Sequence, residues 1–244
     1  MRLTLRDVAC LCFLSFSSLL WAEVSTDDPV AQQNAKVPRI SCDVPLSKEQ
    51  TLSRGLVEGR IKAGQLYAAY AEVMALPPNV AEIAILRADI LRRLGRPEAY
   101  DWFRALQKTC MSGLAEYGLG LLAANDGHYA EARESLLQAV RQMPTDARVR
   151  NDLGYVLILL NQDTQAMFEL RIAAELAPEN RLPVLNLLLL SLLQGNEKEW
   201  AAGVARWQPT ASERSSLAKD CRSLYATRVG IVDGAKVDCP INKL

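Results

Sequence analysis

A spacing of 34 residues recurs through the middle of this 244-residue chain and constrains its fold more than any other feature. The aligned residues are Gly120 and Gly154, Ala132 and Ala166, Leu136 and Leu170, Ala139 and Ala173, Pro144 and Pro178, with two triplets, Leu119, Leu153 and Leu187, and Gly127, Asn161 and Gly195. A fixed period of this length is the signature of stacked structural repeats. We therefore expect similar units in series rather than one irregular core.

Each unit reads as a pair of helices, as residues 113–146 illustrate. The first helix ends near Asn125-Asp126-Gly127, a cluster that favours a turn. The second carries an apolar stripe at helical spacing, made of Ala132, Leu136 and Ala139. It stops at Pro144, because proline cannot continue a helix interior. Gly120 and Ala132 are small, which lets the two antiparallel helices approach closely.

This combination of Leu-Gly, Gly-x-Tyr-x-x-Ala, an apolar residue, Ala and Pro resembles the tetratricopeptide repeat. The resemblance implies an all-α solenoid of about five helix-turn-helix repeats, at 50–79, 80–112, 113–146, 147–180 and 181–209. In the last unit, Leu188 replaces the packing glycine and Trp200 replaces the packing alanine. Thr210 and Glu213 form a capping-box pattern that opens a helix to about Arg228. Within residues 210–244 this helix is expected to cap the open end of the array.

The amino-terminal residues 1–22 have the layout of a secretory signal peptide. Arg2 and Arg6 precede an apolar stretch that ends at Trp21, and Ala22 is a small residue at a possible cleavage site. The alternative is an uncleaved anchor, but the stretch is shorter than the ~20 residues that span a bilayer comfortably. No cysteine directly follows the apolar stretch, so we do not expect a lipoprotein. Residues 23–49 are polar and predicted to be extended or disordered. The predicted location is the periplasm.

Four cysteines remain after residue 22, which suggests disulfides in an exported protein. They allow three connectivities, of which we favour Cys42–Cys110 with Cys221–Cys239. Four buried free thiols are the alternative. None of the spacings suits zinc.

Chemistry-bearing residues are scarce. Lys plus Arg equals Asp plus Glu at 28 each, so the chain offers no basic footprint for nucleic acid. His128, the only histidine, falls at a turn between two helices, where a surface or packing role is expected. Catalysis needs positioned acid–base or metal groups. We therefore predict a non-catalytic protein without cofactor or metal, peripheral to a membrane at most.

Function is then expected on a groove formed by the first helices of successive repeats. The residues predicted to face it are Tyr117, Leu121, Asn151, Tyr155, Ile158, Asn186, Leu189 and Leu193. This mixture of Tyr, Asn and Leu suits an extended peptide or a partner helix. Residues 182–193 are apolar on every face, which predicts either a cover by the carboxy-terminal helix or an open docking patch.

Three runs, Asn151–Tyr155, Ala173–Asn180 and Asn186–Leu190, resemble the TadD-type repeat proteins of tight-adherence (Flp) pilus systems. The resemblance implies an adaptor in pilus assembly or secretion, with pilus or secretin components as partners. The alternative hypothesis is an accessory factor that recruits a cell-wall or envelope enzyme.

Overall fold

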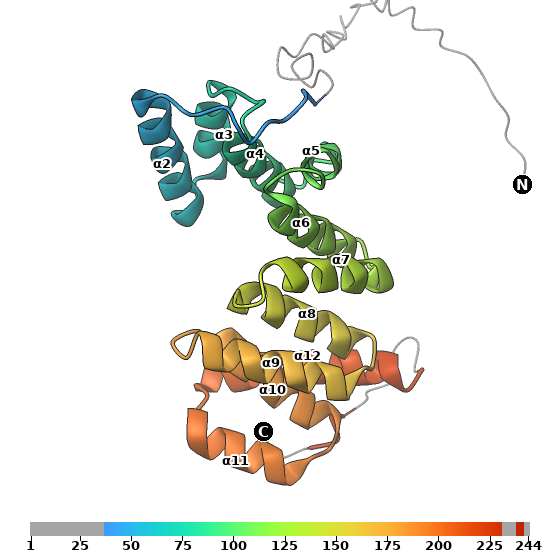
Figure 1. The fold of residues 1–244 in the computed structure, drawn as a ribbon. Helices are drawn as coiled ribbons and strands as arrows, with labels where there is room; N and C mark the ends of the chain where they lie inside the picture. Colours follow the sequence, from blue (N-terminus) through green and yellow to red (C-terminus); the bar gives the residue numbers. More distant parts are fainter. Residues whose placement is uncertain (1–36, 231–237, 242–244) are drawn as a thin grey trace, which may run out of the picture. The chain divides into compact units, whose positions relative to one another are not determined.

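The computed structural model describes residues 37–230 and 238–241. The predicted signal peptide and most of the segment that follows it lie outside these residues. Eleven helices account for the regular structure of the described part, which confirms the all-α solenoid of helical repeats (Figure 1). None of these helices combines the length and hydropathy that a bilayer crossing requires.

Ten of the helices form five consecutive pairs, and an eleventh follows them. The pairs are α2 (Lys48–Lys62) with α3 (Leu66–Met74), α4 (Ala81–Arg93) with α5 (Ala99–Leu106), α6 (Ser112–Asn125) with α7 (Tyr129–Gln142), α8 (Ala147–Leu159) with α9 (Asp163–Leu176), and α10 (Arg181–Leu193) with α11 (Glu197–Trp207). Helix α12 (Ala211–Arg228) comes last. Helices α7 and α9 end two residues before Pro144 and Pro178, in agreement with the role of these prolines as stops.

The turn inside each pair has the same backbone conformation. Its key residue has a positive φ in all five pairs, at Gly64, Gly95, Gly127, Asn161 and Gly195. This left-handed region suits glycine, and asparagine tolerates it better than most other residues. The triplet Gly127, Asn161 and Gly195 therefore recurs because the chain must reverse there.

The middle pairs are held by a leucine that enters a glycine notch. A Cβ atom added to Gly120 would lie 2.7 Å from Leu136 Cγ, and one added to Gly154 would lie 2.6 Å from Leu170 Cγ. Both leucines are fully buried, as are Ala132 and Ala166 beside them. Small residues at these positions let the paired helices approach closely, as the sequence predicts.

The last pair reverses this arrangement. Leu188 on α10 occupies the position of the packing glycine, and its Cδ2 would lie 2.6 Å from a Cβ added to Gly203 on α11. The leucine and the glycine have thus exchanged helices. Trp200, at the position of the packing alanine, is also buried.

The segment before α2 is tied to the array rather than free. The Ser41 amide donates to the Asn79 carbonyl, and the Ala81 amide donates to the Ser41 carbonyl, at 2.8 and 3.0 Å. A disulfide joins Cys42 to Cys110, at the turn before α6. Val37 and Ile40 pack against the core between α4 and α6. This part of the predicted polar segment is therefore extended and covalently anchored.

Helix α12 begins with the capping box expected from the sequence. The Thr210 hydroxyl accepts from the Glu213 amide, and the Glu213 carboxylate accepts from the Thr210 amide, at 3.2 and 2.7 Å. A second disulfide joins Cys221 of this helix to Cys239. Leu217, Cys221, Cys239 and Ile241 belong to the same hydrophobic cluster as Leu192 of α10. The carboxy-terminal residues therefore complete the core of the last two repeats.

Candidate protein-binding surfaces

Three of the predicted groove residues form one polar chain across the first helices of three repeats. Tyr117 on α6 donates to Asp152 on α8 at 2.7 Å, and Asn151 donates to the other oxygen of Asp152 at 3.0 Å. Asn186 on α10 in turn donates to the Asn151 side-chain oxygen at 2.9 Å. The sequence prediction named Tyr117, Asn151 and Asn186 but missed Asp152, which joins them. Both Tyr117 and Asp152, and Asn151 and Asn186, are separated by 35 residues, one more than the period. This shared spacing is the sequence signal that could have revealed the role of Asp152.

Burial dominates the electrostatics of this polar chain. It raises the pKa of Asp152 above its ordinary value, because removing water penalises the charged carboxylate. The hydrogen bonds from Tyr117 and Asn151 oppose that shift. Burial likewise raises the pKa of Tyr117, so its hydroxyl stays protonated and remains a donor. This polar chain thus connects α6, α8 and α10. The hydrogen-bonding groups of its buried members are largely occupied by one another.

Three other predicted groove residues are buried rather than available. Ile158, Leu189 and Leu193 are 1%, 2% and 4% exposed, and they share a hydrophobic cluster with Leu217 and Cys221 of α12. The carboxy-terminal helix packs against α10 and so covers part of the apolar run 182–193, whose first residue, Leu182, stays exposed. Tyr155 on α8 is 36% exposed and Leu121 on α6 is half-buried, so these two groove residues remain accessible.

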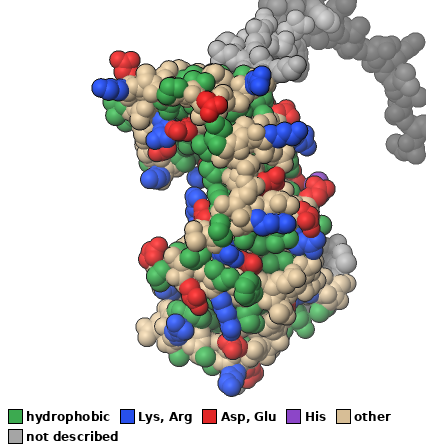
Figure 2. All heavy atoms as spheres, in the orientation of Figure 1, with side chains coloured by type: hydrophobic (Ala, Val, Ile, Leu, Met, Phe, Trp, Pro, Cys, Tyr) green, Lys and Arg blue, Asp and Glu red, His purple; other side chains and the backbone are tan. Residues whose placement is uncertain are grey.

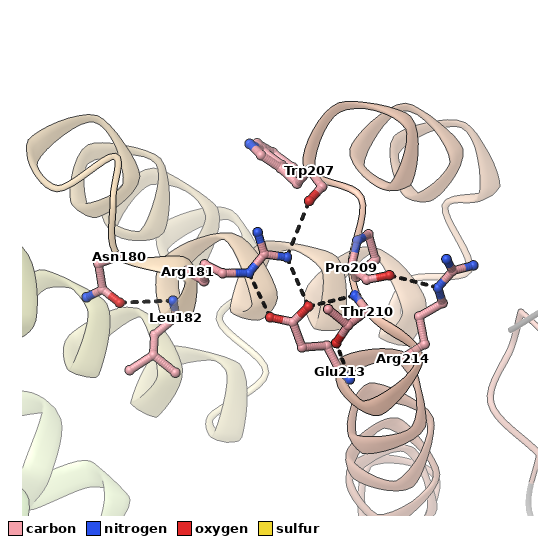
Figure 3. Close-up of polar contacts among 8 residues, drawn as sticks. All are labelled: Asn180, Arg181, Leu182, Trp207, Pro209, Thr210, Glu213 and Arg214. Atoms are coloured by element: carbon pink, nitrogen blue, oxygen red, sulfur yellow. Dashed lines mark hydrogen bonds and ion pairs between the residues drawn. The ribbon is translucent and has the colours of Figure 1, made fainter.

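An ion pair holds the start of α12 against α10. Figure 3 shows the Arg181 guanidinium donating to both carboxylate oxygens of Glu213, at 2.7 and 2.9 Å, and to the Trp207 carbonyl at 3.3 Å. The hydrogen bond from Arg181 is the main reason that the pKa of Glu213 falls to about 2. Glu213 therefore serves both the capping box and the contact with α10.

A second ion pair holds the other end of α12. Arg228 donates to both oxygens of Asp163, at 2.8 and 3.1 Å, and to the Ile158 carbonyl at 2.9 Å. Asp163 opens α9, and Ile158 lies near the end of α8. With a clamp at each end and a disulfide between them, α12 is an integral part of the last two repeats.

Away from α12, two hollows separate successive second helices. One, of about 380 Å³, lies between α9 and α11 over α10, and Met167, Val184, Leu187 and Trp207 are among its walls. The other, of about 550 Å³, lies between α7 and α9, where Leu137, Leu153, Leu157 and Phe168 form its apolar part. Hollows of this kind suit side chains of a bound peptide or protein. The sequence prediction concerned only the first helices and did not include them.

Side chains that can bind a metal ion are dispersed over the described residues. Among them, no group of three or more His, Cys, Asp or Glu side chains could hold a metal ion. His128 is exposed and lies just before α7. Acidic and basic side chains are interspersed over the face shown in Figure 2.

Paired helices stacked in series, with small residues in the notches, define this chain as a helical-repeat scaffold. No family model matches it. It is 38% identical over 182 residues to the TPR repeat-containing protein PA4299 of Pseudomonas aeruginosa, covering 75% of this chain and 74% of that protein. The chain therefore belongs to the tetratricopeptide repeat family.

Two solved structures share the fold at low sequence identity. PilF of Pseudomonas aeruginosa superimposes with a TM-score of 0.58 at 17% identity, over 75% of this chain and 85% of that one. The structure of MamA from residue 41 to its end, from Desulfovibrio magneticus, gives a TM-score of 0.54 at 19% identity, over 70% of this chain and 98% of that one. At these identities the likeness concerns the fold alone.

Proposed function

We propose that this chain is an exported, non-catalytic adaptor that binds a protein during assembly of a tight-adherence pilus or a related secretion machinery. The observation that carries the adaptor role is the free part of the first-helix surface. There, Tyr155 is 36% exposed and Leu121 is half-buried, next to the polar chain that begins at Tyr117. An exposed aromatic ring with an apolar side chain nearby suits a bound peptide or partner helix.

Export is supported by two features of the chain. The first is the basic start and short apolar stretch of residues 1–22, with Ala22 as the expected cleavage point. The second is the pair of disulfides, Cys42–Cys110 and Cys221–Cys239, since such bonds persist in oxidising compartments. Fractionation of cells with mass determination of the released chain tests this. A full-length chain recovered from the cytoplasm, with four reduced thiols, would contradict it.

The pilus assignment is supported by the resemblance of the three runs at Asn151–Tyr155, Ala173–Asn180 and Asn186–Leu190 to TadD-type proteins. The test is chemical cross-linking in intact cells, followed by purification of the tagged chain and identification of what it carries. We expect pilus or secretin components. Cell-wall or other envelope enzymes in their place would favour the alternative role, an accessory factor that recruits such an enzyme.

Two matched variants test whether the partner binds at the surface around Tyr155 and Leu121. Tyr155→Arg combined with Leu121→Arg adds bulk and charge where the partner is expected, and we predict that the cross-linked partner is lost. Ala130→Arg, on the exposed side of α7, makes the same kind of change elsewhere and should leave the partner in place. Retention of the partner by the double variant would refute this surface. The same loss in the Ala130 variant would show that the effect is not local.

A further inference from the structure

The first helix of the array exposes an apolar face. Leu52 and Leu56 on α2 are 70% and 58% exposed, while Val57 and Ile61 on its other side are buried. Gly55 and Gly59 lie on the exposed face, and a Cβ added to either would meet no described atom within 4 Å. Glycine weakens a helix interior, and terminal repeats of a solenoid usually carry a polar outer face. This face therefore has the features of an unfilled contact.

The repeat register shows what kind of contact is unfilled. Counted from the equivalent turn residues Gly64 and Gly127, the exposed face corresponds to Ala115, Gly118, Leu119 and Leu122 of α6. In α6 all four are buried against the preceding repeat. The Phe103 ring of that repeat occupies the notch of Gly118, where a Cβ would lie 2.2 Å from it. The face of α2 is thus the surface on which a preceding second helix would pack.

The other end of the array offers such a helix. Trp200, Ala201, Val204 and Ala205 of α11, together with Ile241, line a shallow hollow of about 400 Å³. Ala201 and Ala205 are exposed, and they correspond to Arg133 and Leu137 of α7. In α7 those two residues line a hollow with Leu153 and Leu157 of the next repeat. Helix α11 therefore presents the side that elsewhere faces a following first helix.

We propose that the occupant of the α2 face is α11 of a second copy of this chain, so that copies join head to tail and continue the repeat array. Consecutive helices in the array alternate in direction, so α11 would run antiparallel to α2. Glu197 at the start of α11 then comes near Lys62 at the end of α2, and Arg206 comes near Glu49. All four side chains are exposed, and both pairs are of opposite charge.

Such a contact uses two different surfaces of the same molecule, so it leaves one free surface at each end and can propagate. It differs in this respect from a two-fold dimer, in which one surface meets itself. The association does not depend on the proposed pilus role, because it rests on the two ends of the array rather than on the surface around Tyr155.

The experiment is sedimentation velocity on the purified full-length chain with both disulfides intact. We expect the average mass to rise with concentration beyond that of a dimer. One double variant, Leu52→Glu with Leu56→Glu, blocks the α2 end, and another, Ala201→Glu with Ala205→Glu, blocks the α11 end. Each alone should be a monomer. An equimolar mixture should form a dimer and stop there, since each variant keeps one intact end.

Controls separate this contact from misfolding and from other occupants. Phe168→Glu, an equally exposed apolar site on α9, should associate like the unaltered chain. Lys62→Glu should weaken association about tenfold, and Glu197→Lys in the same chain should restore it. Circular dichroism should show unchanged helix content in every variant. A monomer at all concentrations, whatever else then covers α2, or a dimer that persists when α11 is blocked, would overturn the proposal.

Discussion

The middle pairs of the array and its carboxy-terminal part reach the same dense packing by different means. In the pairs α6–α7 and α8–α9, a leucine on the second helix enters a glycine notch on the first. In the pair α10–α11 the leucine lies on the first helix and the notch is Gly203 on the second. The last pair is also covered by α12, which a disulfide and two ion pairs hold in place. A repeat with neighbours on both sides buries its apolar surface through the repeated contacts alone. The last repeats need an additional helix, α12, to cover theirs.

The largest expected effect comes from overfilling the glycine notch of a middle pair. In Gly154→Leu the new side chain would overlap Leu170, whose Cγ lies 2.6 Å from the added Cβ, while the Ala166 carbonyl oxygen at 3.4 Å limits any shift. We expect a loss of about 3 kcal/mol or more in the free energy of unfolding, at the upper end of the range for overpacking. Urea unfolding measures it. Ala130→Leu, on the exposed side of α7, is the matched control and should change stability by under about 0.5 kcal/mol.

Removing the second disulfide tests how firmly α12 covers the last repeats. Cys221→Ala with Cys239→Ala opens a loop closed over a sequence separation of 18 residues. We expect a loss of about 3 kcal/mol, because the unfolded chain regains the entropy of that loop. Thermal unfolding followed by circular dichroism provides the measurement. Equal melting temperatures for the variant and the unaltered chain would mean that α12 is held by its other contacts alone.

The exchanged notch predicts a compensated pair of substitutions. Gly203→Leu should cost about 1–3 kcal/mol, since the new side chain meets Leu188 Cδ2 at 2.6 Å from its Cβ. Adding Leu188→Ala should recover part of this loss by making room on α10. Gly203→Leu combined with Leu170→Ala, which shortens a side chain outside this notch, should show no such recovery. A non-additive result in urea unfolding would support the exchange, and simple additivity would argue against it.

The smallest expected effect concerns the ion pair of Figure 3 and its dependence on pH. The pKa of Glu213 in the folded chain is lowered to about 2 by the hydrogen bond from Arg181. A carboxyl with a lowered folded pKa contributes stability above its ordinary pKa near 4.5, and that contribution is lost as the pH falls toward 2. Glu213→Gln keeps the acceptor of the capping box but removes the charge.

Melting temperatures measured from pH 6 to pH 2 check this expectation. The unaltered chain should exceed the Glu213→Gln variant slightly at pH 6, and the two should converge near pH 2. Added salt should reduce the difference at pH 6, because Arg181 is exposed to solvent and Glu213 is partly so. A difference that grows on acidification would contradict the lowered pKa.

The sequence by itself determined the local and periodic features of this protein. The 34-residue spacing predicted the paired helices, the turns at Gly127, Asn161 and Gly195, and the notches at Gly120 and Gly154, since each depends on residues close together within one repeat. The same logic marked Leu188 as a departure from the pattern. It could not show that Gly203 compensates, because nothing in the period pairs those two positions.

Only the tertiary structure decided which surfaces stay open. The predicted groove residues Ile158, Leu189 and Leu193 are buried in a hydrophobic cluster to which α12 contributes Leu217 and Cys221, although their spacing alone placed them on the same surface as the accessible Tyr155. Contacts such as Arg228 with Asp163 join residues that are 65 positions apart. Periodicity shows which side of a helix is apolar. It does not show what covers that side, since this depends on where a distant segment comes to pack.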